Sequence, residues 1–204
     1  IWAVLLDLIL GLAIAYIVVR TRLTGRHIID ALAMLPLAVP GLVLAFGYVS
    51  MTKKPMFSWL DPSRDPTLLL VVAYAVRRLP YVVRSLVAGF EQVAIGLEEA
   101  GYDLGASTMR VLFRITGPLI LPNMIAGGLL AFSFAVLEVS DSLILAQKME
   151  DYPVTKAIFD LYQRLGDGPA IASALGVWAM LLLSVTIIGA SLVLGKRLGS
   201  LFRV

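Results

Sequence analysis

Long apolar runs alternate with short polar connections along most of this chain of 204 residues. Runs that approach roughly 20 apolar residues can cross the hydrocarbon core of a bilayer as helices. Five such spans are predicted, at residues 1–19, 28–49, 67–76, 119–145 and 170–194. The third has a short apolar part that leads into Arg77-Arg78-Leu79-Pro80, which fits a helix continuing through Pro80 beyond the hydrocarbon. The pattern predicts an all-α, polytopic membrane protein.

Composition supports the membrane assignment and removes several other classes of protein. Hydrophobic residues make up 59% of the chain and charged residues only 15%, against about 25% in typical soluble domains. The mean hydropathy is +0.90. The chain has no Cys, so neither a disulfide framework nor a thiolate metal site is available. The net charge of +3 does not indicate nucleic-acid binding, because the basic residues cluster at the ends of apolar runs.

The distribution of Lys and Arg orients the predicted spans, because short cytoplasmic loops carry an excess of these residues. Eleven of them fall on one side and six on the other. The side with eleven holds Arg20, Arg22, Arg26, Arg77, Arg78, Arg84, Arg110, Arg114, Lys196, Arg197 and Arg203. This bias predicts a cytoplasmic loop at residues 91–118 and a cytoplasmic C-terminus.

A polar segment rich in acids and Gly interrupts the apolar runs between the third and fourth spans. Leu97, Ala100 and Leu104 follow helical spacing and share one face, and acids gather near the start of this helix, where its dipole favours them. Gly101 and Gly105 have no side chains, so a partner can approach the backbone closely there. Gly105 is also suited to end the helix. An amphipathic helix resting on lipid headgroups would carry Lys or Arg instead of these acids. The segment therefore favours docking of a soluble partner.

The same segment resembles the cytoplasmic EAA loop of ABC-transporter importer permeases, written E-A-A, three residues, G, nine residues, I-x-L-P. The residues in register are Glu99, Ala100, Gly105, Ile115 and Pro118. Two positions depart from the pattern, because Gly101 replaces the second Ala and Gly117 replaces the Leu. The resemblance extends over nearly the whole chain and implies the type I importer permease fold.

This resemblance implies that residues 91–118 form a coupling loop seated in a cleft of a cytoplasmic ABC ATPase dimer. The positions that it assigns to coupling are Glu98, Glu99, Ala100, Gly101, Leu104, Gly105, Ala106, Ile115 and Pro118. It also implies a second permease domain, a solute-binding protein outside, and a multi-pass location in a bacterial inner membrane. The chain has no Gly-rich P-loop, so ATP and Mg²⁺ belong to the partner, and the chain is predicted to be neither an enzyme nor a cofactor carrier.

The chain is expected to form a single permease domain over residues 1–204. It opens inside an apolar run at Ile1-Trp2-Ala3, without Met. Ferric-type permeases often fuse two such domains, so the expectation is a fragment or the C-terminal half of a fused permease.

Two groups of residues are candidates for the translocation path. Pro36, Pro40 and Gly41 interrupt the second span, either as a hinge that lines the path or as a purely structural kink. Glu138, Ser140 and Asp141 lie near the outer end of the fourth span. Acids inside a span are costly and usually face a cavity or partner, and the two here, three apart, share one helical face. The alternative places Asp141 at the interface, solvated or paired with Lys148 or Arg164.

The remaining features of the spans have simpler expected roles. The arginines around Pro80, namely Arg77, Arg78 and Arg84, are expected to anchor a span end at lipid headgroups. Gly127, Gly128, Ala131 and Ser133 form a strip of small residues for close helix packing, within the subunit or against a second permease half.

The stretches at residues 76–81 and 137–142 look most like ferric-iron permeases, with 2-aminoethylphosphonate, thiamine and polyamine permeases as relatives. Ferric iron is therefore the solute that the resemblance favours. An alternative of another class is an ion-coupled secondary transporter or channel that uses Glu138 and Asp141. A third is a membrane scaffold that only recruits a soluble partner.

Overall fold

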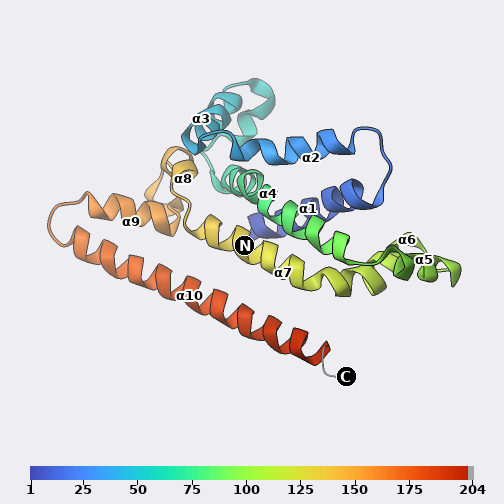
Figure 1. Cartoon of the computed structure of the whole chain (residues 1–204). Coiled ribbons are helices and arrows are strands. Elements are labelled where there is room, and N and C mark those ends of the chain that lie inside the picture. Colours follow the sequence, from blue (N-terminus) through green and yellow to red (C-terminus); the bar gives the residue numbers. More distant parts are fainter. Residues whose placement is uncertain (202–204) are drawn as a thin grey trace. The chain divides into compact units, whose positions relative to one another are not determined.

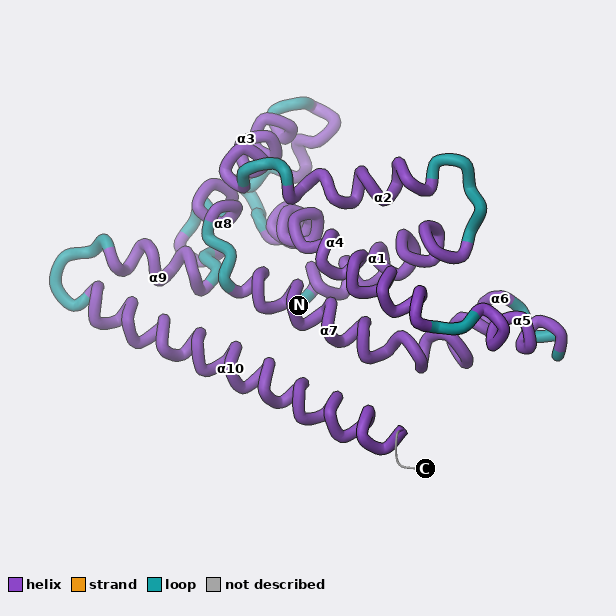
Figure 2. Tube along the Cα trace, in the orientation of Figure 1, coloured by secondary structure: helices purple, strands orange, loops and turns teal. Residues whose placement is uncertain are grey.

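The computed structural model describes residues 1–201 and is helical almost throughout (Figure 1). No strand occurs in this range, which confirms the all-α class (Figure 2). The α-helices are α1 (Trp2–Arg20), α2 (Arg26–Met34), α3 (Gly41–Thr52), α4 (Thr67–Gln92), α5 (Ile95–Asp103), α6 (Thr108–Val111), α7 (Gly117–Val136), α8 (Ser140–Leu145), α9 (Val154–Tyr162) and α10 (Gly168–Leu201). Short turns of other helix types are η1 (Leu35–Leu37), η2 (Pro55–Leu60), η3 (Leu112–Thr116) and η4 (Met149–Asp151).

Three segments of the described chain are long and apolar enough to cross a membrane by themselves. They are α1, Thr108–Val136 and Gly168–Gly189, which agree with the first, fourth and fifth predicted spans. The second predicted span is broken between Arg26–Leu37 and Gly41–Thr52, and the pair passes the same test only as one broken span or a re-entrant loop. The third lies in α4, which continues through Pro80 as expected.

The chain divides into two compact units, of which the first comprises residues 1–38 and 76–131 and the second residues 39–75 and 132–204. The division falls inside α4 and α7 and in the break that follows η1. Each unit has its own apolar core.

In the first unit, α1, α2, α4 and α7 contribute to one core. Its buried side chains are Ala15, Ala33, Val82, Val83, Leu86, Val87, Phe90, Val93, Ile120 and Ala131. The predicted strip of small residues packs inside this unit. A Cβ added to Gly127 would lie 2.9 Å from the Cβ of Ser85, and Gly128 faces Leu8. The strip therefore serves helix packing within the subunit at these two positions.

The arginine prediction is wrong for Arg78. Its side chain does not reach the headgroups, because the residue is only 3% exposed and interacts electrostatically with Asp7 of α1, which is 1% exposed. Arg84 donates a hydrogen bond of 2.9 Å to the Oδ2 of Asp30 on α2. Arg84 thus forms an ion pair within the unit, and Arg78 interacts through its charge with a buried acid of the same unit.

In the second unit, α3 packs against α8, and α9 packs along α10. Figure 1 shows α9 and α10 as neighbouring helices joined by a short connection. The buried residues of the core are Leu69, Leu70, Ala73, Leu145 and Ala146.

The fourth predicted span is too long, because α7 ends at Val136 and α8 begins only at Ser140. Glu138 lies in the break between them, so the prediction that Glu138 and Asp141 share one helical face is wrong. The cause is polar capping: the Oε1 of Glu138 accepts the N–H of Asp141 at 3.2 Å, and its carbonyl accepts the hydroxyl of Thr155. A carboxylate that accepts a first-turn N–H favours a new helix start at this point.

The predicted cytoplasmic C-terminus remains a prediction. Arg203 lies outside the described residues, and the side chains of Lys196 and Arg197 are not described.

Candidate functional site

The polar segment singled out in the sequence folds as α5, followed by α6 and η3, all within the first unit. Helix α5 ends as predicted at Gly105, whose φ of +80° is readily adopted only by glycine. The N–H of Gly105 bonds to the carbonyl of Tyr102 at 2.8 Å, and the N–H of Ala106 bonds to that of Gly101 at 3.0 Å. These two bonds form a Schellman motif, so the helix end is fixed by local hydrogen bonding.

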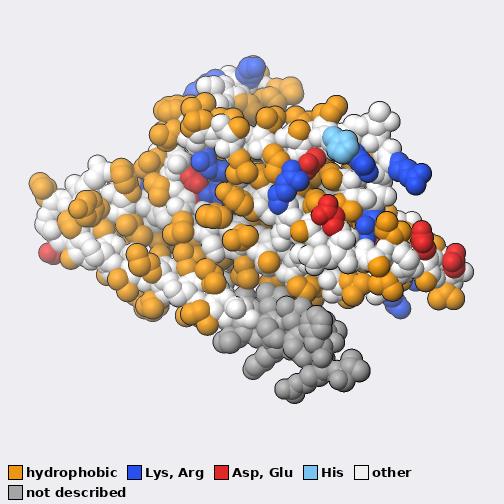
Figure 3. Space-filling view, in the orientation of Figure 1, with side chains coloured by type: hydrophobic (Ala, Val, Ile, Leu, Met, Phe, Trp, Pro, Cys, Tyr) orange, Lys and Arg blue, Asp and Glu red, His pale blue; other side chains and the backbone are white. Residues whose placement is uncertain are grey.

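The apolar face of α5 points outward. Leu97 is 50% exposed, Leu104 is 90% exposed, and Ala100 between them is also exposed. Glu99 and Asp103 flank this face and are exposed as well. Figure 3 shows acidic and hydrophobic side chains together at the end of this unit where α5 lies. Exposed apolar patches rimmed by polar residues are often interaction sites, so this face is a candidate for one.

The opposite side of α5 is buried and holds a carboxylate. Glu98, adjacent to exposed Glu99, is 6% exposed. Both of its oxygens accept hydrogen bonds from the Nε of Arg20 at 3.0 Å, and its Oε1 also accepts the hydroxyl of Thr116 at 2.8 Å. Successive helical residues point about 100° apart, so the two neighbouring acids face different surroundings.

Arg20, the last residue of α1, also binds the end of α4. Its Nη2 donates to the carbonyls of Phe90 and Val93 at 2.9 Å each. The guanidinium carbon lies 5.7 Å from the centre of the Phe90 ring, a favourable cation–π geometry. Arg20 and Glu98 side chains are each 8% exposed, so this ion pair is buried.

The return segment from η3 to α7 depends on close packing at two glycines. A Cβ on Gly101 would lie 2.6 Å from the Cδ1 of Ile115. A Cβ on Gly117 would lie 2.8 Å from the backbone carbonyl oxygen of Leu112, across the π-helical turn of η3. These are the two positions at which the sequence departs from the EAA pattern, so the departures accompany tighter packing here.

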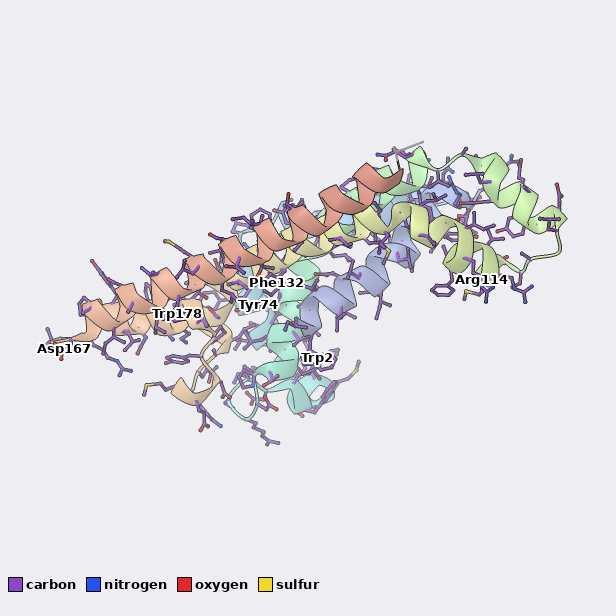
Figure 4. The ribbon with its side chains drawn as sticks, turned by 90° about the horizontal axis from the view of Figure 1, so that it is seen from below. Trp2, Tyr74, Arg114, Phe132, Asp167 and Trp178 are labelled. Atoms are coloured by element: carbon purple, nitrogen blue, oxygen red, sulfur yellow. The ribbon has the colours of Figure 1, made fainter. Side chains whose placement is uncertain are left out.

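The coupling candidates therefore fall into three classes of exposure. Exposed residues are Glu99, Ala100, Leu104, Gly105 and Pro118, whereas Glu98 and Gly101 are buried and Ala106 and Ile115 are half-buried. Arg114 precedes α7 and is exposed, and Figure 4 shows its side chain at that end of the helix.

The pathway candidates are distributed over both units. Pro36 lies in η1 of the first unit, while Pro40 caps the start of α3 and Gly41 is its first residue, both in the second unit. Glu138 is 8% and Asp141 1% exposed, so neither acid is solvated at an interface.

Lys156, which the sequence analysis missed, anchors the other end of α8. Its Nζ donates to the carbonyls of Leu143 and Ala146 and lies 4.4 Å from the centre of the Tyr152 ring. Burial lowers the pKa of Lys156 below its usual range. The proposed partners of Asp141 are engaged elsewhere: Lys148 binds the carbonyl of Arg64, and Arg164 binds Asp160 at 2.7 Å.

The sequence analysis also did not predict the buried interactions of three other polar residues. Asp7 was identifiable as an acid inside an apolar span, a recognised signal of a buried interaction. Arg20 was counted only as a basic residue that orients the spans, and Thr116 carries no sequence signal of its own. In the described residues, no group of three or more His, Asp or Glu is arranged to hold a metal ion.

Long apolar helices together with a short helix that has an exposed apolar face fit a helical membrane transport subunit. The chain belongs to the family described as the binding-protein-dependent transport system inner membrane component, which matches residues 7–198. It is therefore the permease subunit of an ABC importer, located in the inner membrane, and not an enzyme. Members of this family work with an ATPase and a binding protein.

Several transport permeases are similar to the chain. The molybdenum transport system permease protein ModB of Escherichia coli K12 is 31% identical over 181 residues, which cover 80% of this chain and 76% of ModB. A probable sulfate transport system permease protein, cysT of Anthoceros angustus, is 30% identical, with 84% of this chain and 62% of cysT covered. The ferric transport system permease protein FbpB of Actinobacillus pleuropneumoniae is 31% identical over 136 residues, or 66% of this chain and 19% of FbpB.

Proposed function

We propose that the outward face of α5 is the surface on which this permease receives its ATPase. The observation that carries the proposal is the inverted burial of the helix: Leu97 and Leu104 are exposed while Glu98 is buried. An apolar face kept in water at the end of a fixed helix is costly unless a partner covers it.

Individual residues have distinct roles in this surface. Glu99 provides a charge for a basic group of the ATPase, and Leu104 provides an apolar contact that fits a pocket. Gly105 ends the helix and, having no side chain, allows the ATPase to approach closely. The half-buried Ala106 follows it and adds an apolar contact. The half-buried Ile115 and the exposed Pro118 support the return segment.

The transport cycle then follows from movement of the loop. ATP and Mg²⁺ bind between the ATPase subunits and close them, and the coupling helices of two permease domains move with them. The spans of the permease respond by opening the path to the outer side, where the binding protein delivers its solute. The C-terminus and residues 91–118 lie on the cytoplasmic side in this arrangement, as the Lys and Arg distribution favours.

For the solute we propose a small inorganic ion. The names of the similar permeases refer to molybdenum, sulfate and ferric ion. Molybdenum or sulfate is favoured over ferric iron, because the match with ModB covers 80% of this chain and the match with FbpB covers 66% of it. Pro36, Pro40, Gly41, Glu138, Ser140 and Asp141 remain the candidates for lining the path.

The solute assignment is tested by uptake into proteoliposomes that contain the complete transporter and its binding protein. Labelled molybdate, sulfate and ferric ion are supplied separately, with and without internal ATP. ATP-dependent uptake of one of the two oxyanions is expected. Uptake of ferric ion alone would refute the preference for an oxyanion.

The docking surface is tested by co-purification of the full-length permease with its ATPase. Leu104→Ala and Glu99→Gln are each expected to weaken binding of the ATPase, by roughly tenfold for the leucine, because burying a leucine side chain contributes about 1.5–3 kcal/mol. Asp167→Asn is the matched control, since Asp167 is an exposed acid in the turn before α10 (Figure 4). Unchanged binding in both α5 variants would refute the assignment of this face.

A further inference from the structure

The guanidinium of Arg20 joins four segments of the first unit at one buried point. Arg20 ends α1, Glu98 belongs to α5, Thr116 ends η3, and the carbonyls of Phe90 and Val93 terminate α4. We call the group formed by Arg20, Glu98 and Thr116 the Arg20 joint. Arg20 and Glu98 are separated by 78 positions in the sequence.

The chemistry of the joint suits a rigid connection. Arginine presents a planar fork of donors, so one side chain can bind the carboxylate through Nε and two carbonyls through Nη2 in a fixed geometry. The carbonyls of Phe90 and Val93 lie at the C-terminal end of α4, where the helix dipole favours a positive charge. Thr116 adds a third bond to the carboxylate of Glu98.

The two sides of α5 are thus in different environments. Glu99 faces outward, on the surface proposed to bind the ATPase, and Glu98 faces inward, into the Arg20 joint. The chain itself links α5 to α4 and, through α6 and η3, to α7. The first helix has no such covalent link, and it meets α5 through Arg20 and, one turn earlier, through Tyr16 beside Tyr102.

We propose that the Arg20 joint transmits movement of the coupling helix α5 to α1. This inference rests on the proposed docking of an ATPase on the outer face of α5. Glu98 is then a positioning residue that does not touch the ATPase. Breaking the joint leaves the docking surface in place but allows α5 to move without α1, so ATP hydrolysis becomes uncoupled from transport.

The first test measures coupling in the assembled transporter. In proteoliposomes with ATPase and binding protein, Glu98→Gln is expected to keep the complex assembled and to reduce uptake per ATP hydrolysed by about tenfold, within the range of coupling changes that single residues produce. Thr116→Val retains the ion pair and is expected to give a smaller loss. The yield of folded protein and its apparent Tm are recorded for every variant, so misfolding is separated from uncoupling.

A double-mutant cycle determines whether Arg20 and Glu98 act through one contact. Arg20→Gln combined with Glu98→Gln is expected to reduce uptake per ATP no further than the worse single variant, because both remove the same interaction. Additive losses would refute a shared joint.

The second test measures movement directly. The sequence has no Cys, so spin labels can be introduced at Leu23→Cys, in the exposed loop after α1, and Gly96→Cys, an open position on α5. With Glu98 present, the distance between the labels is expected to stay the same in the ATP-bound and ATP-free complex. With Glu98→Gln it is expected to change between these states.

The outcomes separate the two proposals. If Glu98→Gln leaves both uptake per ATP and the label distance unchanged, while Leu104→Ala loses the ATPase, the joint is refuted and the docking surface stands. Glu98→Gln could instead uncouple transport while Leu104→Ala and Glu99→Gln retain full ATPase binding. That result would refute the docking surface. It would also refute the proposed transmission from this surface through the Arg20 joint.

Discussion

Helices α5 and α8 are both short, and each is held by charged side chains from other segments. Arg20 binds Glu98 on the inner side of α5, whereas Lys156 binds the carbonyls at the end of α8 and Glu138 binds an N–H at its start. Their exposure differs. On α8, Asp141, Ser142 and Leu145 are all buried, while α5 keeps a leucine that is 90% exposed.

This difference shows that similar anchoring serves two purposes. The anchors of α8 fix a helix on which Asp141, Ser142 and Leu145 are buried. The anchor of α5 fixes one side of a helix so that the other side remains available. Short helices have little stability of their own in isolation, so both depend on these contacts.

The largest expected effect distinguishes the two sides of α5. Glu98→Ala leaves the buried guanidinium of Arg20 without its carboxylate, and it is expected to lower the free energy of unfolding by about 3 kcal/mol. Glu99→Ala, at the neighbouring exposed position, is expected to change it by less than about 0.5 kcal/mol. Thermal unfolding of the detergent-purified permease compares the two. Equal effects would contradict the contrast between an anchored and a free side.

An intermediate effect is expected at the anchor of α8. Lys156→Met preserves the length of the side chain but removes the donor to the carbonyls of Leu143 and Ala146, at an expected cost of about 2 kcal/mol. Lys148→Met is the control, because exposed Lys148 binds a single carbonyl, that of Arg64.

Hydrogen exchange of the amides in α8 provides the measurement for this second contrast. Exchange is expected to accelerate in Lys156→Met and to stay near the parent rate in Lys148→Met. Unchanged protection in Lys156→Met would mean that α8 is held by packing alone.

The smallest effect separates two glycines of the coupling segment. Gly105→Ala forces a non-glycine residue to a φ of +80° and is expected to lower stability by about 1 kcal/mol. Gly96→Ala, on α5 with open space around it, is expected to raise stability by a similar amount of roughly 0.5–1 kcal/mol. Opposite shifts in apparent Tm are the expected result. A shift of the same sign in both variants would contradict the assigned role of Gly105.

Hydropathy predicted the long helices well but located their ends poorly. Both α1 and α10 follow from apolar runs, and α4 continues through Pro80 as expected. The fourth span was predicted nine residues too long, from 136 to 145, because Leu137 and Val139 are apolar on either side of Glu138. The hydrogen bonds of Glu138 and Thr155 that separate α7 from α8 involve partners that an apolar count ignores.

Motif spacing located the candidate site but not the direction in which its residues point. The pattern placed Glu98, Glu99, Gly101 and Leu104 in one coupling segment. It treated them alike, although Glu98 and Gly101 are buried. The tertiary structure also explains why glycine occupies positions 101 and 117. A side chain on Gly101 would meet Ile115, and one on Gly117 would meet the carbonyl of Leu112.

The sequence by itself determined the all-α class, the family, the main spans and the end of α5 at Gly105. These properties depend on the hydropathy, spacing and backbone preferences of residues close together in the chain. The tertiary structure decided which of two adjacent acids became an internal anchor and which remained exposed. That choice depends on Arg20, 78 positions before Glu98, and only folding brings its charge to the helix.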